Sequence, residues 1–169
     1  MIALKNNGLF FSIFTIIIGC AFFACNSGNN GNNTDPNKSI DEQTVNHELK
    51  NIEFIKKESK ETVILAVEVP QIKDYAIGLS NKNKVENFGM LFNFREETKY
   101  QGFSMKNTKF NLSIAFIDAN KIIIDIQEMR AFHDKIYISK YPFQYAIEAP
   151  EEWFLINEIN VGDSVGIPE

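Results

Sequence analysis

Short apolar segments separated by polar turns fill the chain from Asn51 onward, and they constrain its fold more than any other feature. Val, Ile, Leu and Phe dominate these segments, and β-branched and aromatic residues favour strands. The first two segments, residues 52–55 and 62–69, flank the charged run 56–61. A polar run of this length between two apolar segments is typical of a solvated hairpin turn, so the pattern predicts an early β-hairpin.

Later segments continue the same pattern. Further strands are expected at residues 89–94, 103–106, 112–117, 122–126 and 145–148, and a closing turn and strand at 161–165. Two short helices are expected, one at 71–77 ending at Gly78 and one at 150–156 beginning with Pro150. Residues 128–139 are read as irregular. The sequence therefore predicts an α+β fold of predominantly antiparallel strands, a compact sheet or small barrel-like domain with two short helices.

The first residues have the layout of a secretory signal. Lys5 precedes a run of fifteen uncharged residues, 9–23, which is shorter than the roughly 20 residues that span a bilayer as a helix. The motif Phe-Phe-Ala-Cys that ends at Cys25 resembles the lipobox of bacterial lipoproteins. Cys20 fits that consensus better at two positions, but cleavage there would leave Ala-Phe-Phe-Ala at the membrane. Cys25 is therefore the favoured lipidation site.

These features predict three parts of the chain: a lipoprotein signal peptide at 1–24, a lipidated Cys25 with an Asn- and Gly-rich tether at 25–47, and a folded domain at 48–169. The tether is too polar to order itself. Multiple acyl chains would hold the protein at a membrane, so we expect a lipid-anchored protein of the cell envelope whose domain faces the periplasm or the cell surface. Both cysteines precede the domain, which leaves it without disulfides or thiol sites.

Charge and composition bear on the possible partners. The net charge is −5, and removal of Lys5 with the signal leaves −6. Nucleic acid is an unfavourable partner for such an acidic chain, because binding to its phosphates relies on clustered Lys and Arg. His47 and His133 are the two histidines, which is too few for a typical zinc site. No metal or cofactor is expected, and no phosphate-binding or nucleophile motif is present.

Several short motifs identify a family. They are Gly78-Leu79, Gly89-Met90-Leu91-Phe92, Phe103, Met105-Lys106-Asn107-Thr108 and Phe116-Ile117-Asp118, followed by Tyr145, Glu148, Pro150, Trp153 and Val161-Gly162-Asp163. Together these residues resemble the DUF192 family, small bacterial and archaeal domains with no established biochemical role. The chain departs from the family at Ser104, where members commonly carry an aromatic residue, and at Ser113, where they carry an acid. The resemblance implies a family domain over about residues 67–165 but no reaction.

The segment 103–107 contains the polar residues that best fit a binding site. Alternation places Phe103 and Met105 on one face of a strand and Lys106 on the other. Lys106, Asn107 and Asp118 could bind an anionic or polyhydroxyl ligand through an ammonium, a carboxamide and a carboxylate. The alternative is structural: Asn107 ends the strand, Lys106 is solvated and Asp118 belongs to a hairpin turn. At Ser113, the missing acid removes a possible partner for Lys106.

The function that these residues favour is a non-catalytic envelope domain that binds a small polar ligand or an envelope component. Two alternatives stay open. One is a hydrolytic enzyme that acts on envelope material and uses Lys106 and Asp118 as acid and base. The other is a structural module that docks on a partner protein through a sheet edge or an apolar patch. No catalytic residue is assigned, because no recognisable catalytic set is present.

Overall fold

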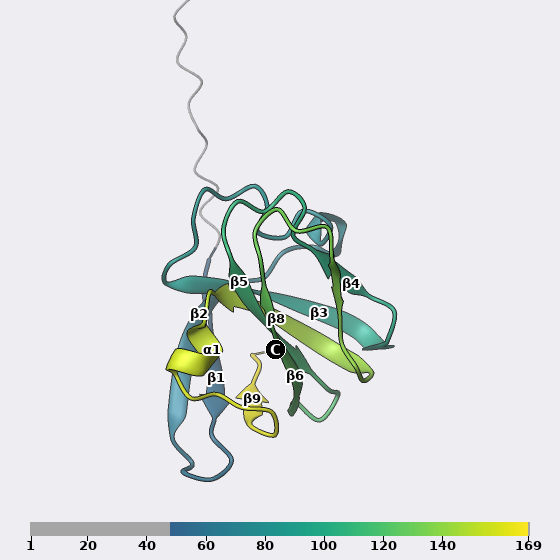
Figure 1. Ribbon diagram of the computed structural model, residues 1–169. Helices are drawn as coiled ribbons and strands as arrows, with labels where there is room; N and C mark the ends of the chain where they lie inside the picture. Colours follow the sequence, from purple (N-terminus) through teal and green to yellow (C-terminus); the bar gives the residue numbers. More distant parts are fainter. Residues whose placement is uncertain (1–47, 169) are drawn as a thin grey trace, which may run out of the picture. The chain divides into compact units, whose positions relative to one another are not determined.

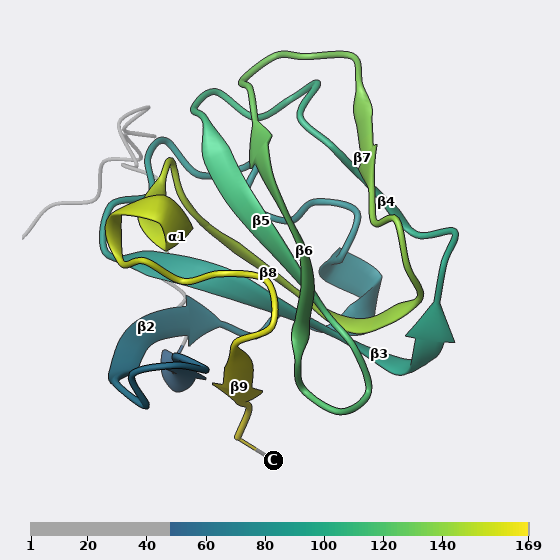
Figure 2. The ribbon, with the colours of Figure 1, turned by 60° about the horizontal axis from the view of Figure 1, so that its bottom comes forward.

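A computed structural model describes residues 48–168, and in this part of the chain nine strands form two sheets. The larger sheet has seven strands in the order β6-β5-β8-β3-β2-β1-β9 (Figure 1), and the smaller sheet pairs β4 with β7 (Figure 2). The strands are β1 (Lys50–Ile55), β2 (Thr62–Glu68), β3 (Phe88–Thr98), β4 (Gly102–Ser104), β5 (Leu112–Ile117), β6 (Ile123–Met129), β7 (Ile136–Ile138), β8 (Phe143–Pro150) and β9 (Ser164–Gly166).

Most strand pairs are antiparallel, as the sequence predicts. The early hairpin is present, with β1 and β2 paired from Lys50 with Val67 to Ile55 with Thr62. Among the described strands, β2 and β3 form the one parallel pair. The long connection between them, which contains residues 69–87, makes this parallel pairing possible. The predominantly antiparallel fold is therefore confirmed.

The larger sheet curls but does not close into a barrel. Its edge strands β6 and β9 meet beside one isolated bridge, Ile122 with Ser164, and the backbone N–H of Val165 donates to the carbonyl of Lys121 at 2.8 Å. A closed barrel would need a continuous ladder along both edge strands. The arrangement is thus an open, curled sheet.

The prediction of two short helices is wrong in one detail. Residues 71–77 contain a single 3-10 turn, η1 (Ile72–Asp74), followed by further turns, because η1 buries none of its side chains and so gains no packing to offset the cost of helix nucleation. The described part of the chain has one α-helix, α1 (Trp153–Ile156), which packs Phe154 into the core. Residues 128–139, read as irregular, contain β7, whose Tyr137 is buried between exposed Ile136 and Ile138.

Two apolar cores lie on opposite faces of the larger sheet, because successive strand residues point to opposite sides. In β8, Ile147 and Ala149 belong to the core that includes Phe154 of α1. Ala146 of β8 belongs to the other core, which β4 and β7 cover through Phe103 and Tyr137. Glu148 follows the same alternation as Ala146 and therefore points toward this second core.

Candidate functional site

Lys106 and Asn107 lie in the turn that follows β4. The turn is closed by the backbone N–H of Thr108, which donates to the carbonyl of Met105 at 3.1 Å. The side chains of Lys106 and Asn107 are exposed, whereas Met105 and Thr108 on either side are buried. In this four-residue motif, the buried members are therefore the outer two.

Asp118 lies in the turn between β5 and β6. Its Oδ1 accepts a hydrogen bond from the backbone N–H of Ile122 at 2.8 Å, and Asn120 Nδ2 donates to Oδ2 at 3.5 Å. Within the described residues, no hydrogen bond or ion pair joins Asp118 to Lys106 or Asn107. Asp118 thus has a structural role in the hairpin, and ligand binding by these three residues stays a prediction.

Glu148 is the acid whose surroundings differ most from those of a surface carboxylate. It lies on β8 between β3 and β5, opposite Met90 on one side and Ile114 on the other. Its side chain is 7% exposed. The neighbouring strand approaches closely because residue 89 is glycine: a Cβ there would lie 2.3 Å from the carbonyl oxygen of Glu148. Gly89 therefore sets how near β3 can come to the backbone that carries this acid.

The Oε2 atom of Glu148 is buried and makes no hydrogen bond. Burial raises the pKa of Glu148 to about 7, because desolvation penalises the charged carboxylate. The other buried acids of the described chain have partners. They are Glu68 with Lys82 at 2.6 Å, Asp125 with Gln127 at 2.7 Å, and Asp163 with the backbone N–H groups of Lys57 and Asn160 at 2.8 and 2.7 Å.

A cavity of about 210 Å³ lies over Glu148. Its lining combines aromatic residues from the loop after η1, from β3 and from β4 with a few uncharged polar side chains. The lining includes Tyr75, Gly78, Phe92, Phe94, Gln101, Phe103, Ser104, Thr108 and Glu148. We call this cavity the Glu148 pocket. Five of these residues, Gly78, Phe92, Phe103, Thr108 and Glu148, belong to the family motifs, so motifs far apart in sequence meet here.

Gly78 forms part of the wall close to the acid. Its φ of +52° lies in the left-handed region that favours glycine, and a Cβ at this position would lie 3.6 Å from Glu148 Oε2. On the other side of Gly78 is a second cavity of about 230 Å³, which Glu68, Asp74 and Lys82 help to line. Lys82 is committed to its ion pair with Glu68 there, so it does not neutralise Glu148.

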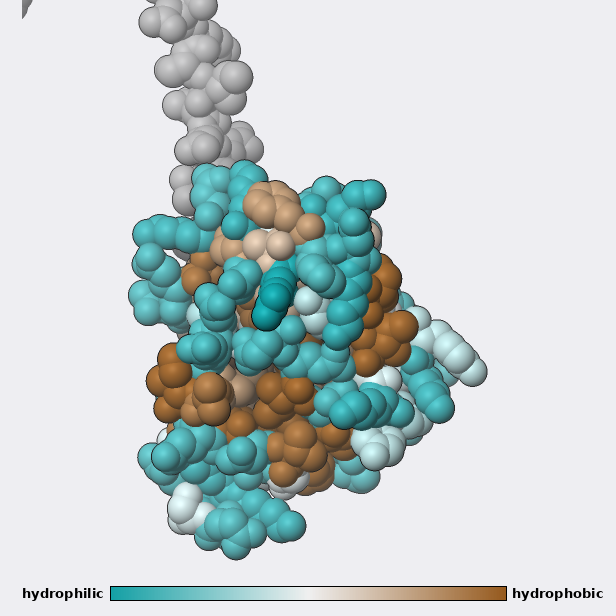
Figure 3. All heavy atoms as spheres, in the orientation of Figure 1, coloured by the Kyte–Doolittle hydropathy of each residue, from teal (hydrophilic) through white to brown (hydrophobic). Residues whose placement is uncertain are grey.

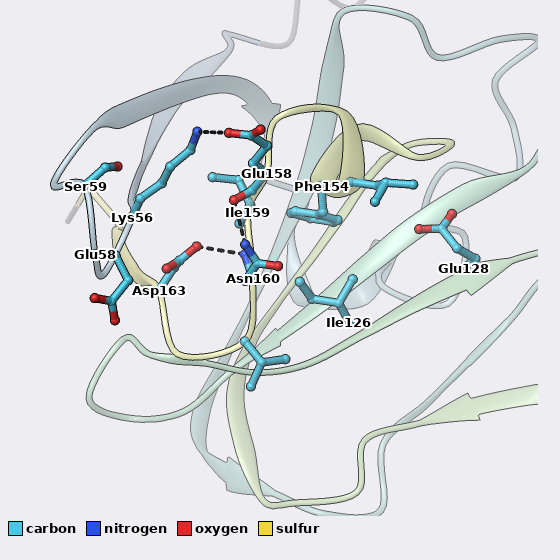
Figure 4. Close-up of a pocket in the computed structure, with 12 residues that line it drawn as sticks. Lys56, Glu58, Ser59, Ile126, Glu128, Phe154, Glu158, Ile159, Asn160 and Asp163 are labelled. Atoms are coloured by element: carbon cyan, nitrogen blue, oxygen red, sulfur yellow. Dashed lines mark hydrogen bonds and ion pairs between the residues drawn. The ribbon is translucent and has the colours of Figure 1, made fainter.

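A larger groove of about 800 Å³ lies beside the β1–β2 turn and α1 (Figure 4). Its one lysine, Lys56, is paired with two acids. Lys56 contacts Glu61 at 2.9 Å and Glu158 at 3.2 Å, and the hydrogen bond with Glu61 is the main cause that raises the pKa of Lys56. Figure 4 also shows Asp163 accepting from the Asn160 backbone. These contacts tie the hairpin to the loop before β9, which is a structural role.

Apolar side chains gather over α1 on the face drawn in Figure 3. Leu155 and Ile156 are each 71% exposed, and Val161 is 60% exposed. Leu155 and Val161 line the large groove. The groove therefore combines an apolar rim with satisfied ion pairs, whereas the Glu148 pocket is smaller and contains an acid without a partner. This difference favours the Glu148 pocket as the functional site.

Ser113, the position at which family members carry an acid, lies on the opposite face of the sheet from the Glu148 pocket. It is completely buried on β5, and its hydroxyl donates to the carboxylate of Glu128 on β6 at 2.7 and 2.8 Å. A carboxylate is therefore present beside position 113, supplied by the neighbouring strand. The loss of the acid at Ser113 does not alter the Glu148 pocket.

The pocket offers few groups for acid-base chemistry. Apart from Glu148, its titratable lining residue is Tyr75, whose hydroxyl donates to the carbonyl of Asn93 at 2.8 Å and accepts from the N–H of the same residue at 2.9 Å. Tyr75 is thus held by β3. The remaining polar side chains, Gln101, Ser104 and Thr108, can donate or accept hydrogen bonds without changing charge.

Glu148 is not among the site residues predicted from the sequence, although a signal is present there. Residues 145–149 read Tyr-Ala-Ile-Glu-Ala, so an acid interrupts an apolar strand. Buried acids are rare unless paired, and this position could have been flagged for that reason. What could not be read was the absence of a partner, because that depends on β3, β4 and the loop after η1.

Other predictions concern residues outside the described range. The signal peptide, the tether and the lipidation site Cys25 all fall within residues 1–47, and so does the alternative site Cys20. Among residues 48–168, no helix combines the length and apolar character that crossing a membrane requires.

Comparison with known proteins supports the family resemblance. The sequence model of DUF192, described as an uncharacterised ACR, matches residues 54–167. A search of curated proteins found no relative.

Two solved structures have similar folds. A proposed transcription regulator from Sinorhizobium meliloti is 24% identical with a TM-score of 0.66, and the alignment covers 71% of this chain and 94% of that one. A protein of unknown function from Novosphingobium aromaticivorans is 16% identical with a TM-score of 0.65, over 74% of this chain and 89% of that one. At these identities the likeness concerns the fold alone.

Proposed function

This chain belongs to the DUF192 family, and we propose that the pocket in which several of the family's motifs meet binds a small polar ligand. The domain is then a non-catalytic binding module. Its ligand lies over Glu148, with the loop after η1 on one side and β4 on the other. The volume of about 210 Å³ is below the roughly 300–1,000 Å³ of pockets for drug-sized molecules, so the ligand is small.

The observation that carries this proposal is the unpartnered Oε2 of Glu148 at the pocket. A buried carboxyl without a hydrogen bond destabilises a fold by roughly 1–3 kcal/mol. An apolar residue at position 148 would avoid this cost, since Met90 and Ile114, which lie opposite it on the neighbouring strands, are apolar and buried. A ligand that bonds Glu148 gives the residue a role that packing does not.

Catalysis has less support than binding. General acid-base reactions usually need a second group that takes or gives a proton, or a nucleophile beside a base. In the Glu148 pocket the second titratable group is Tyr75, and its hydroxyl is already bonded twice to Asn93. Ser104 and Thr108 line the same pocket, but no hydrogen bond joins either hydroxyl to Glu148.

The cellular setting that we propose is the bacterial cell envelope, with the domain tethered to a membrane through lipid on Cys25. The support is the sequence of the leader: a single positive charge, an apolar run and a lipobox-like motif. A binding module in this position would meet its ligand outside the cytoplasm. Ligand binding and anchoring are separate proposals and are tested separately.

A thermal-shift screen tests the binding proposal. The library contains amines, amino acids, organic acids, sugars and cell-wall fragments, and four proteins are compared: wild type, Glu148→Gln, Lys106→Ala and Glu96→Gln. Glu96 is an exposed acid of β3 and controls for the loss of one charge. At a concentration of about 100 Kd a ligand adds about 2.7 kcal/mol, which raises Tm by about 10 °C in a domain of this size.

We expect a compound that stabilises wild type, Lys106→Ala and Glu96→Gln but not Glu148→Gln. Loss of the response in Lys106→Ala alone would move the site to the turn after β4, as the sequence analysis predicts. A library in which nothing stabilises the wild type would contradict the binding proposal itself.

A further inference from the structure

We propose that the ligand of the Glu148 pocket is a small organic ammonium ion, held between the Glu148 carboxylate and the aromatic side chains that line the pocket. This inference rests on the proposed binding function and names its ligand class. It follows from three properties of the pocket: its uncompensated acid, its aromatic lining and its lack of a metal-binding set of side chains.

The acid has no cation of its own. Lys82, which lines the neighbouring cavity beyond Gly78, forms its ion pair with Glu68 at 2.6 Å and lies 5.6 Å from the centre of the Phe88 ring. The pKa of Glu148 responds to desolvation by burial and not to a nearby positive charge. Desolvation of an ion costs several kcal/mol, and a positively charged ligand would offset much of this cost by attraction to the carboxylate.

The pocket walls are rich in aromatic rings. Tyr75, Phe92, Phe94 and Phe103 all line it. These rings form one connected group, since Tyr75 contacts Phe92 and Phe94 at centroid distances of 5.2 and 5.5 Å, and Phe92 contacts Phe103 at 5.2 Å. Aromatic faces attract ammonium groups, and the attraction is stronger at desolvated sites than at exposed ones. A carboxylate among such rings is the arrangement that recognises alkylated ammonium groups.

A metal ion fits the same residues poorly. Calcium takes six to eight oxygen ligands and magnesium an octahedral set, usually with more than one carboxylate. Among the described residues, no group of three or more His, Cys, Asp or Glu side chains could hold a metal ion. The rings around Glu148 instead offer apolar contact to the carbon atoms of an organic cation, while Gln101, Ser104 and Thr108 can bond a hydroxyl group on it.

Choline and 3,3-dimethylbutan-1-ol, called dimethylbutanol below, form a matched pair of probes. The second has a carbon atom in place of the choline nitrogen, so the two differ in charge and little in shape. Their binding to the full chain, purified in a non-ionic maltoside detergent, is measured by titration calorimetry. Wild type, Glu148→Gln and Glu96→Gln are compared at pH 8, where Glu148 is mostly ionised. We expect wild type and Glu96→Gln to bind choline at least tenfold more tightly than dimethylbutanol, and Glu148→Gln to lose this preference.

The outcomes separate the ligand class from the binding function. Equal affinity for the two probes, or a preference for dimethylbutanol, would overturn the ammonium inference. So would a choline preference that persists in Glu148→Gln, because the selectivity would then arise elsewhere. Failure of both probes to bind wild type would overturn it too, whereas the binding function fails only if the broad thermal-shift library also yields no ligand that depends on Glu148.

Discussion

Replacement of Glu148 by Gln should change how the stability of the ligand-free domain depends on pH. Burial raises the pKa of Glu148 from its ordinary value of 4.5 to about 7. Between these two pH values the folded protein holds a proton that the unfolded chain has released, so the free energy of unfolding falls as pH rises. The stabilising contribution is complete below about pH 4.5 and is lost as pH passes through 7.

The size of the effect follows from the pKa difference. Each pKa unit corresponds to about 1.4 kcal/mol, so a rise from 4.5 to about 7 gives a loss of about 3 kcal/mol across this pH range. Gln cannot ionise, and the Glu148→Gln variant lacks this loss. The absolute stability of the variant does not enter this comparison, because the prediction concerns the difference between the two pH profiles.

Urea unfolding at a series of pH values from 4.5 to 8.5 measures this difference. The free energy of unfolding of wild type minus that of Glu148→Gln should fall by about 3 kcal/mol over the series. Ionisable groups that the two proteins share cancel in the subtraction, including Tyr75 in the same pocket and Glu68, Asp74 and Lys82 in the neighbouring one. Glu96→Gln serves as the charge control and should stay parallel to wild type. Parallel profiles for Glu148→Gln would refute the view that Glu148 is buried without a compensating partner.

Two further predictions concern the backbone beside the site and the membrane anchor. Gly89→Ala should destabilise the domain by about 2 kcal/mol in urea unfolding, because the new Cβ would lie 2.3 Å from the carbonyl oxygen of Glu148 and 3.0 Å from Leu65. An unchanged unfolding midpoint would contradict this, since it would show that β3 can move away from β8 at no cost. Cys25→Ser should abolish acyl labelling and membrane retention in a bacterial host while Cys20→Ser should not, and the reverse result would assign the lipid to Cys20.

The strands could be predicted well because their signal is local. Five of the six residues from 112 to 117 are apolar, and the charged run 56–61 marks the first turn, so β5 and the β1–β2 hairpin follow from neighbouring residues. The segment 71–77 has a helical composition but packs no side chain of η1 into a core, and a turn formed instead. Helix formation in so short a segment depends on tertiary contacts, which a local pattern does not contain.

The site could be predicted only in part, for a related reason. The sequence predicts a strand over residues 103–106, whereas β4 ends at Ser104, and Lys106 and Asn107 are the predicted site residues because they are polar. The structure turns those two side chains to solvent and Thr108 toward the pocket. Glu148 becomes notable only when β8 pairs with β3 and β5, strands that lie more than 25 residues before it in sequence. Long-range pairing, and not composition, creates the unpartnered acid.

The position of Glu148 also relates stability to function. The residue weakens the fold most at neutral and alkaline pH, where its carboxylate is ionised and buried, and this is the state that a positively charged ligand would bind best. The same unfavourable desolvation that lowers stability in the free protein therefore provides part of the free energy of binding, because the ligand relieves it. Gly78 and Gly89 contribute to this burial. Gly89 lets the backbone of β3 approach that of Glu148, and Gly78 lets the pocket wall approach the Glu148 carboxylate, each more closely than a larger residue would. A pocket held in this way would be ready for its ligand without a large conformational change.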